Sequence, residues 1–300
     1  MSIEHLFADR TPFRTTAELV DAGISPFELT AATRAGTLVR VRRGHYTPPG
    51  TSPALVSAVR VGGLLCCVSA LRSYGIWVAE EPFIHVWMRR NASRMRSPRD
   101  RWRPLTVDTR DGVELHWWPL NSQPQPGSGR VALVDALAQA VRCQPRSFAI
   151  AALDSALNTG LMDLPSVERL LSRLPDRLRG ILVDIDGRSM SGIETILRLA
   201  LRRAGFDCDL QVHVSGVGRV DIVVEGCIVV EADGRDYHDT GTARERDYER
   251  DLTLTIAGYT VLRFSYRQVM FQLPSVLEAI RVALANRARR DRPVALGEAR

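Results

Sequence analysis

Hydrophobic and polar positions in this chain follow a helical spacing in some stretches and a strand-like alternation in others. Apolar residues recur every three or four positions over 131–141, 148–157 and 193–201, and this spacing predicts amphipathic helices. Two runs rich in valine and isoleucine, 219–224 and 227–232, are separated by a tight turn, which predicts a β-hairpin. The two patterns together predict an α/β protein of more than one domain.

The C-terminal third has the most regular order of elements. Ser191 and Glu194 form a capping signal for a helix that Gly205 ends, and a later helix ends at Gly258. The predicted elements are a helix from 191 to 205, strands at 209–214, 219–224 and 227–232, a helix over 242–257, a strand at 259–264 and a last helix from about Pro274. This order predicts an α/β core with a mixed central sheet.

The first part of the chain predicts a compact helix-turn-helix followed by a hairpin. Thr15 with Glu18, and Ser25 with Glu28, have the spacing of capping boxes. Residues 38–46 then alternate like a small basic hairpin. Two short helices and such a hairpin, or wing, predict a winged helix, a common DNA-reading module. A small domain that contacts protein is the alternative, because a fold alone does not determine function.

This segment resembles the N-terminal domain of antitoxins from abortive-infection (type IV) toxin–antitoxin systems. The resemblance rests on the paired helices and on the run Gly36-Thr37-Leu38-Val39-Arg40-Val41-Arg42-Arg43-Gly44-His45-Tyr46. It implies DNA or operator binding and phage defence, with Arg40, Arg42 and Arg43 as candidate DNA-binding residues. A cognate toxin would then be a partner.

Residues 54–175 have a less regular pattern and contain all the tryptophans of the chain. Arginines crowd between 89 and 103, interleaved with tryptophan. Such a run could clamp a nucleic-acid backbone, with Arg89 and Arg90 as candidate DNA-binding residues. It could equally form a solvated loop beside an aromatic core. Both interpretations stay open at this point.

The charge of the chain favours an anionic partner. The formal net charge is +6, and lysine is absent from the sequence. This absence excludes a Walker-type phosphate loop, a lysine Schiff base and a Ser-Lys dyad. Arginine suits phosphate, because its planar guanidinium binds two oxygens at once and keeps its proton. DNA is a partner of the expected class.

Cysteine usage and the start of the chain indicate a cytoplasmic protein. The five cysteines are an odd number without the spacing of a metal site, and we interpret them as free thiols in a reducing compartment. The N-terminus lacks a signal-peptide pattern and no apolar run could span a bilayer, so we expect no membrane association. His45, His85, His116 and His213 stand apart from one another in sequence, and we interpret them as structural.

Two acidic residues interrupt the aliphatic runs of the predicted hairpin, Asp221 in the first and Glu231 in the second. Burying an unpaired carboxylate is costly, so acids at such positions usually bind a metal ion or transfer protons. A two-residue turn at Glu225-Gly226 would put the two acids on opposite faces, whereas a three-residue loop would put them on one face. We predict the three-residue loop, or else that the backbone carbonyl of Ala232 serves in place of the Glu231 side chain.

The segment 191–264 resembles the PD-(D/E)XK nuclease superfamily and, within it, proteins similar to very-short-patch-repair endonucleases. The matching pieces are Ile193-Glu194, Gly218-Arg219-Val220-Asp221, Val230-Glu231-Ala232-Asp233-Gly234 with Tyr237-His238, Arg246-Asp247, and Gly258-Tyr259-Thr260-Val261-Leu262-Arg263-Phe264. The resemblance implies a restriction-endonuclease-like α/β core that hydrolyses phosphodiester bonds.

The resemblance also implies the ligands of a catalytic Mg²⁺ or Mn²⁺ ion. Asp221 corresponds to the principal metal ligand, Glu231 to the (D/E) position, and the Ala232 carbonyl completes the site. Glu194 corresponds to the helix acid that holds water at the metal. Asp233 stands where the signature requires lysine, which is the main departure from the family pattern.

Proton transfer is assigned by the same resemblance. His238 corresponds to the general base or water-positioning group of the short-patch-repair enzymes, and Asp247 to the acid that supports it. Histidine is suited to accepting a proton near neutral pH. Arg246 or Arg250 could neutralise the phosphate in place of the missing lysine, although arginine is a poor base.

The sequence therefore predicts a winged helix over 1–50, an α-rich middle domain over 51–185, a nuclease-like domain over 186–290 and a tail over 291–300. The predicted function is a Mg²⁺-dependent endodeoxyribonuclease, targeted by the winged helix, in phage defence or DNA repair. The alternative is a non-catalytic, antitoxin-like transcriptional regulator that binds DNA and has a degenerate nuclease domain. A homodimer would supply the two active sites needed to cut both strands of a duplex.

Overall fold

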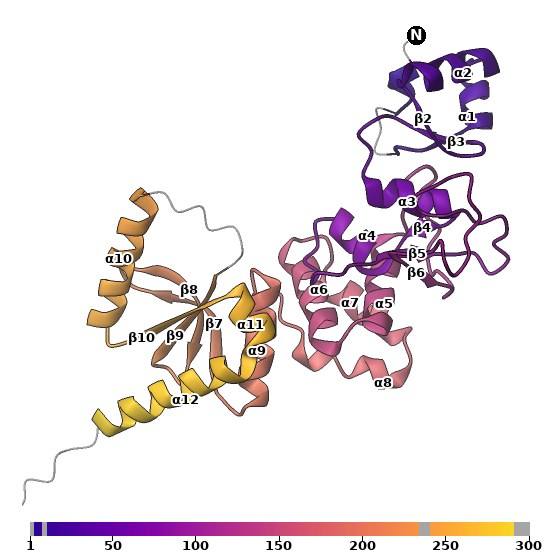
Figure 1. The fold of residues 1–300 in the computed structure, drawn as a ribbon. Coiled ribbons are helices and arrows are strands. Elements are labelled where there is room, and N and C mark those ends of the chain that lie inside the picture. Colours follow the sequence, from indigo (N-terminus) through magenta and orange to yellow (C-terminus); the bar gives the residue numbers. More distant parts are fainter. Residues whose placement is uncertain (1–2, 8–10, 234–240, 291–300) are drawn as a thin grey trace, which may run out of the picture. The chain divides into compact units, whose positions relative to one another are not determined.

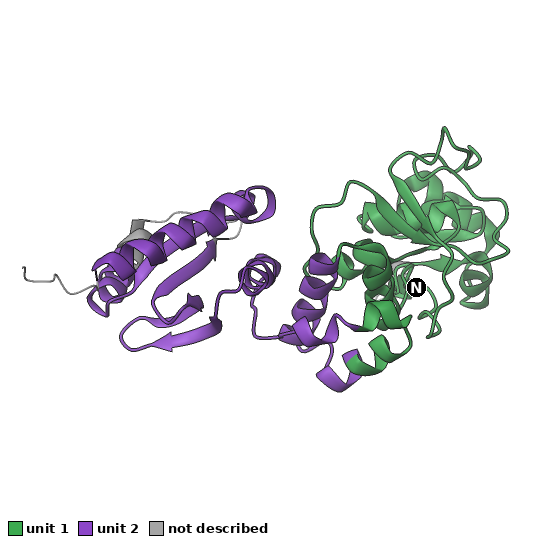
Figure 2. Cartoon of the chain, turned by 90° about the horizontal axis from the view of Figure 1, so that it is seen from below, with its two compact units in different colours: residues 1–145, 168–179 green, residues 146–167, 180–300 purple. Residues whose placement is uncertain are grey.

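The computed structural model describes residues 3–7, 11–233 and 241–290, with side chains for 5–7, 11–232 and 248–290. The chain divides into two compact units (Figure 2): unit 1 comprises residues 1–145 and 168–179, and unit 2 comprises residues 146–167 and 180–300. Among the described residues, none of the helices combines the length and the apolar character that a membrane crossing requires.

The N-terminal part of unit 1 packs short helices around a small sheet with strand order β1-β3-β2 (Figure 1). Its elements are the 3-10 helix η1 (Ile3–Phe7), β1 (Arg14–Thr15), α1 (Thr16–Asp21), α2 (Pro26–Ala35), β2 (Val39–Arg42) and β3 (His45–Thr47). Both predicted capping boxes are confirmed. In the first, the Thr15 hydroxyl accepts from the Glu18 backbone N–H, and the Glu18 carboxylate accepts from the Thr15 N–H. Ser25 and Glu28 form the second in the same way.

The predicted basic hairpin is confirmed as the antiparallel pair of β2 and β3. Apolar side chains from both helices and from the hairpin make one core, which consists of Phe7, Leu19, Leu29, Leu38 and Tyr46. The helices and the hairpin therefore form one packed structure.

The rest of unit 1 contains a second small sheet as well as helices. Its elements are α3 (Pro53–Val61), β4 (Leu64–Leu65), α4 (Cys67–Ser73), β5 (Ile84–Trp87), β6 (Val113–His116), α5 (Leu133–Cys143) and α8 (Asp176–Arg179). The strand order is β4-β5-β6, and β5 runs parallel to β6. The helix predicted over 131–141 is confirmed as α5. The sheet differs from the α-rich prediction, because strands of two to four residues are too short to show a recognisable alternation.

Unit 2 is built on a mixed sheet. Its elements are α6 (Arg146–Asn158), η2 (Leu182–Asp184), α9 (Gly192–Arg203), β7 (Cys208–Val214), β8 (Gly218–Val224), β9 (Ile228–Asp233), α10 (Gly241–Ile256), β10 (Thr260–Ser265), α11 (Tyr266–Phe271) and α12 (Leu273–Arg290), while α7 (Leu164–Ser172) contains the boundary between the units. The strand order is β10-β9-β8-β7, with β10 parallel to β9 and the other neighbours antiparallel. The predicted mixed sheet, and the order of helix, three-strand meander, helix and strand, are confirmed.

Helix α9 is joined to α6 by a buried ion pair. Arg198 Nη2 donates to Asp154 Oδ2 at 2.8 Å, and both side chains are completely buried. The Thr195 hydroxyl donates to the same oxygen, and the Asp186 backbone N–H donates to Oδ1. Burial raises the pKa of Asp154 to about 6, against the lowering effect of these donors. One carboxylate thus joins α6, α9 and the segment that follows η2.

Replacement of Asp154 by alanine is expected to destabilise the protein by about 3–5 kcal/mol, because it leaves the charge of Arg198 buried without its partner. The free energy of unfolding in urea measures this loss. Asp176→Ala is the matched control: Asp176 and its partner Arg179 are exposed, so stability should change by no more than about 1 kcal/mol. Equal losses in the two variants would contradict the role of the buried pair.

Candidate active site

The hairpin of β8 and β9 has the loop length that the acidic pattern predicts. Val224 pairs with Ile228, which leaves residues 225–227 as a three-residue loop. The pair farthest from the loop is Ile222 with Val230, and the next residue of each strand is Asp221 and Glu231, respectively. The predicted three-residue loop is therefore confirmed, and it brings the two acids to the same level of neighbouring strands.

Asp221 is a half-buried carboxylate that accepts a hydrogen bond from the Ala232 backbone N–H at 3.1 Å. Burial raises its pKa to about 6, and the nearby carboxylates of Glu194 and Glu231 contribute to the rise. The Ala232 N–H and the Arg250 guanidinium act in the opposite direction. Asp221 is therefore ionised at neutral pH, although its burial and the repulsion from nearby carboxylates disfavour the charged form. A bound cation would relieve this free-energy cost.

Glu194 lies in the first turn of α9 and is only 4% exposed. Its Oε2 atom accepts from the Met190 backbone N–H at 2.9 Å and from the Gln211 side-chain amide at 3.0 Å. The Ser191 hydroxyl caps the helix by accepting from the Glu194 N–H. Gln211 lies opposite Asp221 in the register of β7 with β8, so this amide links the helix acid to the sheet beside Asp221.

Both oxygens of the Glu231 carboxylate are occupied by arginines. Oε1 accepts from Arg250 Nη2 at 2.7 Å, and Oε2 accepts from Arg263 Nε at 2.8 Å. Arg263 also donates to Asp251, and the hydrogen bond with Asp251 is the main cause of the raised pKa of Arg263. The metal-ligand role implied for Glu231 would require one of these arginines to move.

Four predicted catalytic or DNA-binding side chains lie outside the described part of the chain. His238 belongs to residues 234–240, which the structure does not describe. Asp233, Arg246 and Asp247 belong to β9 and α10, but their side chains are outside the described set. The roles assigned to these residues stay predictions.

A pocket of about 470 Å³ lies beside Glu194 in unit 2. Its lining includes Met190 and Gln211, which both donate to Glu194. The exposed residues Arg188 and Arg219 also line it. The acidic site therefore adjoins a pocket where Arg219 suits a phosphate group, whereas Arg188 donates two hydrogen bonds to Asp186.

The predicted DNA-binding residues of unit 1 differ in exposure. Arg43, Arg89 and Arg90 are exposed, whereas Arg40 and Arg42 are half-buried. Arg42 and Arg89 line a cavity of about 490 Å³. Burial is the main cause that lowers the pKa of Arg42.

The arginine-rich run between 89 and 103 has aromatic surface in contact with solvent. Trp102 is 71% exposed, and the Arg101 guanidinium carbon lies 5.1 Å from the centre of its ring. Trp102 is therefore not part of an aromatic core.

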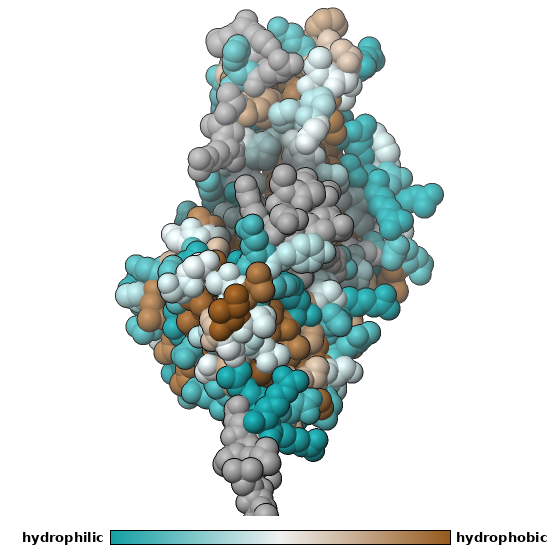
Figure 3. Space-filling view, turned by 90° about the vertical axis from the view of Figure 1, so that its left-hand side faces the viewer, coloured by the Kyte–Doolittle hydropathy of each residue, from teal (hydrophilic) through white to brown (hydrophobic). Residues whose placement is uncertain are grey.

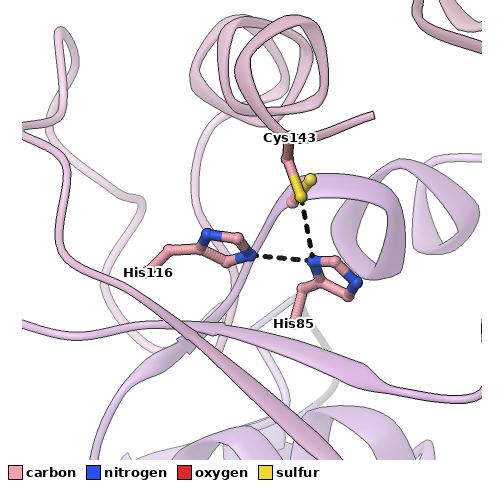
Figure 4. Close-up of side chains that lie close together, drawn as sticks. His85, His116 and Cys143 are labelled. Atoms are coloured by element: carbon pink, nitrogen blue, oxygen red, sulfur yellow. Dashed lines mark hydrogen bonds between the residues drawn. The ribbon is translucent and has the colours of Figure 1, made fainter. Parts of the chain in front are cut away.

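The interpretation of His85 and His116 as isolated structural residues is wrong in one respect, because the fold brings the two rings together. His85 Nδ1 lies 2.8 Å from His116 Nε2, and Cys143 Sγ lies 3.9 Å from the same His85 nitrogen (Figure 4). Cys67 belongs to this group as well. The Cys67 thiol is hydrogen-bonded to Cys143. This bond and the two imidazoles hold the pKa of Cys143 well below its usual range. The same bond raises the pKa of Cys67. The spacing of these residues in sequence carries no metal-site signal, so only the fold reveals the group.

One family model agrees with the fold of unit 2. Residues 194–284 match the family model REase_MTES_1575, which describes a restriction-endonuclease-like family. The matched segment begins at Glu194 and contains Asp221 and Glu231. A comparison with curated proteins finds no match. The chain therefore has a C-terminal restriction-endonuclease-like domain, a class that suggests a nuclease and that generally uses divalent metal ions.

Asp221→Asn is expected to stabilise the protein near pH 7.5 and to leave its stability unchanged near pH 4. The folded-state pKa of about 6 lies above the ordinary value of 3.8, so the folded protein keeps a proton that the unfolded chain releases between these values. Stability therefore falls as pH rises through this interval, by at most about 3 kcal/mol, and asparagine removes the loss. The melting temperature as a function of pH measures the effect.

Asp209→Asn, at an exposed position of β7, is the control and should leave the pH dependence of the melting temperature as in the wild type. If Asp221→Asn followed the wild-type curve at every pH, the electrostatic account of this site would be incorrect.

Proposed function

We propose that the protein is a metal-dependent DNA endonuclease that hydrolyses phosphodiester bonds and acts in the cytoplasm. The observation that carries this proposal is the half-buried Asp221, which lies close to Glu194 within a restriction-endonuclease-like domain. Carboxylates forced together against their repulsion are typical of sites that bind cations or move protons.

The donors around Asp221 fit a hard divalent cation. The Asp221 carboxylate and the Ala232 backbone carbonyl would hold Mg²⁺ or Mn²⁺, and Glu194 would orient a water molecule beside them. The fit rests on the oxygen-only donor set and on the carboxylate repulsion, which a cation would remove. When bound, such an ion supplies charge that neutralises the phosphate and lowers the pKa of the attacking water.

Proton transfer would depend on two side chains of this domain. His238 would accept the proton of the attacking water at one ring nitrogen, which suits its ordinary pKa range. Asp247 would accept a hydrogen bond from the other ring nitrogen and so orient the imidazole. Both roles follow from the family resemblance of the motifs.

Arginine would replace the missing motif lysine. Glu231 fixes the Arg250 guanidinium at 2.7 Å, near enough to Asp221 for its charge to lower the pKa of that carboxyl. Arg250, with Arg246, would stabilise the negative charge that develops on the phosphate. Arg219 would bind the DNA backbone along the adjoining pocket.

Unit 1 would direct the enzyme to DNA. The two capped helices and the basic hairpin with Arg40, Arg42 and Arg43 support a winged helix. Exposed Arg89 and Arg90 would add phosphate contacts. In the same run, solvent-exposed Trp102 offers a stacking surface for bases. A role in phage defence or DNA repair follows from the family resemblances.

A homodimer would cut both strands of a duplex, since each active site cuts one. Its support is an apolar stripe on α10, where Tyr248, Leu252 and Ile256 recur at every fourth residue and are 63%, 61% and 78% exposed. Figure 3, seen from the side of Figure 1 on which α10 lies, shows hydrophobic side chains gathered on this face. An exposed stripe of this kind fits the self-complementary contact of a twofold dimer.

A second candidate function is a non-catalytic, antitoxin-like transcriptional regulator with a cognate toxin as partner. The observation that favours it is the neutralised Glu231, whose two oxygens both bind arginines while Asp233 stands in the lysine position. In this case the nuclease-like domain would serve binding or assembly, and unit 1 would bind an operator.

The deciding experiment is cleavage of supercoiled plasmid DNA by the full-length protein with Mg²⁺ or Mn²⁺. Wild type should nick the plasmid, and EDTA should stop the reaction. Asp221→Ala should lose at least about a hundredfold of the rate, because it removes the proposed central ligand. Glu194→Gln should lose a smaller factor, since it keeps the shape and the Met190 hydrogen bond while removing the charge.

Asp209→Ala is the matched control and should cleave like wild type, because Asp209 is an exposed acid on β7. DNA that is retarded in gels but uncut by wild type with either metal would reject the nuclease and favour the regulator. Cleavage that Asp221→Ala retains in full would instead reject the assigned site.

A further inference from the structure

Unit 1 brings together four side chains that can ligate a metal ion. Cys67 begins α4, His85 lies on β5, His116 ends β6 and Cys143 ends α5. One ligand atom of each lies within 4.8 Å of those of the other three. In the part of the chain that the structure describes, these residues form the one such group found.

The distances within the group are close to those of a tetrahedral zinc centre. With Zn–S of about 2.3 Å and Zn–N of about 2.0 Å, neighbouring ligand atoms lie roughly 3.3–3.8 Å apart. The His85 Nδ1 to His116 Nε2 distance is 2.8 Å, and the Cys143 Sγ to His85 Nδ1 distance is 3.9 Å. Shifts of about half an ångström would bring these atoms to tetrahedral spacing. Figure 4 shows the Cys143 sulfur and the His116 ring both directed at His85.

Backbone and ring contacts hold the group in place. The Cys67 N–H donates to the buried Gln139 Oε1 at 3.0 Å, and the His85 N–H donates to the Ser69 hydroxyl at 2.9 Å. The His116 ring stacks on Trp118, with ring centres 4.8 Å apart. Cys67 also has a φ of +47°, an uncommon conformation for a residue other than glycine, which tends to occur where a side chain must take a set position.

Burial makes the group costly without a ligand. Cys67 is fully buried, and His85 and His116 are 3% and 5% exposed. Buried polar groups lose their hydrogen bonds to water, a cost that metal ligation would offset. A divalent cation would replace close contacts between polar atoms by four metal–ligand bonds.

We propose that Cys67, His85, His116 and Cys143 form a closed, four-coordinate Zn²⁺ site that ties α4 and α5 to the β5–β6 sheet. Two thiolates and two neutral imidazoles give the soft, mixed S₂N₂ set that selects zinc. The two thiolate charges balance the two charges of the ion, so the buried centre is neutral. Each sulfur that still has its proton when the ion arrives releases that proton to solvent.

Four protein ligands leave no position open for substrate, so the site is structural. Its stabilising effect acts on unit 1, whereas the proposed nuclease centre lies in unit 2. A test of the zinc site therefore gives the same answer whether or not the protein is a nuclease.

The test measures metal in the full-length, tag-free protein after dialysis, by mass spectrometry of the elements. We expect about one zinc per chain. Protein refolded with Co²⁺ should show the thiolate-to-metal charge-transfer band and the intense visible bands of tetrahedral cobalt. Cys143→Ser and His116→Gln should each lose most of the bound zinc and both sets of bands.

Two control variants distinguish the loss of a metal ligand from a folding defect. Cys227→Ser, a half-buried thiol of unit 2, should keep its zinc and its cobalt spectrum. A conservative Cys143→His variant, which can still ligate, should keep bound metal and lose part of the sulfur charge-transfer intensity.

Three results would overturn the proposal. One is protein without stoichiometric zinc that also gives no tetrahedral cobalt spectrum. Another is zinc that Cys143→Ser and His116→Gln both retain, because the metal would then lie elsewhere. The third is a Cys67–Cys143 disulfide, or a Cys143 thiol alkylated at the same rate with and without zinc, which would indicate a redox pair or a free nucleophile.

Discussion

The buried ion pair of Arg198 with Asp154 is the interaction on which the organisation of unit 2 depends. Asp154 receives hydrogen bonds from Arg198 and Thr195 of α9 and from the Asp186 backbone, and it belongs to α6. Arg198 Nε and Nη1 have no hydrogen-bond partner among the described residues, so this guanidinium relies on the bond from Nη2 to one carboxylate. Since a half-broken buried pair is far more costly than an intact one, α9 has one favourable position against α6.

The position of α9 determines the electrostatics of the candidate site. Glu194 is in its first turn, held by Met190 and Gln211, and its charge contributes to the raised pKa of Asp221. The helix thus brings an acid toward another acid, which costs stability. The gain would be a place for a divalent cation and a polarised water molecule, as the proposed hydrolysis requires.

Glu231 shows how a protein without lysine can arrange the same neighbourhood. Its carboxylate accepts hydrogen bonds from Arg250 of α10 and Arg263 of β10, so two guanidinium groups bind the acid that the resemblance assigns to the (D/E) position. The bonds fix the direction of Arg250, whose charge then acts on Asp221. Such an arrangement provides a permanent positive charge near the acids and no basic amine for proton transfer. Proton transfer in the proposed mechanism therefore depends on histidine.

Local rules were enough to predict much of this fold. The Thr15 and Ser25 capping boxes mark the starts of helices because the signal lies within four residues, and the three-residue loop after Val224 follows from the need to bring two acids level. Helix α11 was not predicted from the sequence, although Ser265 and Gln268 form the same capping signal.

Features that depend on distant partners could not be predicted. The strands β4, β5 and β6 are too short for a periodic signal. The arginines that bind Glu231 come from elements 19 and 32 residues away, and nothing in their local sequence indicates the pairing. Likewise, His85 and His116 are 31 residues apart in sequence, and the parallel pairing of β5 with β6 brings them together.

In the proposed enzyme, Asp221 and the Ala232 carbonyl hold a divalent ion in the nuclease-like domain. The most direct measurement is an anomalous-scattering map at the manganese edge from crystals of the full-length protein grown with Mn²⁺. We predict a peak within coordination distance of an Asp221 carboxylate oxygen and the Ala232 carbonyl oxygen, at roughly 2.0–2.4 Å. A map in which both groups are well ordered and no manganese lies between them would contradict the account.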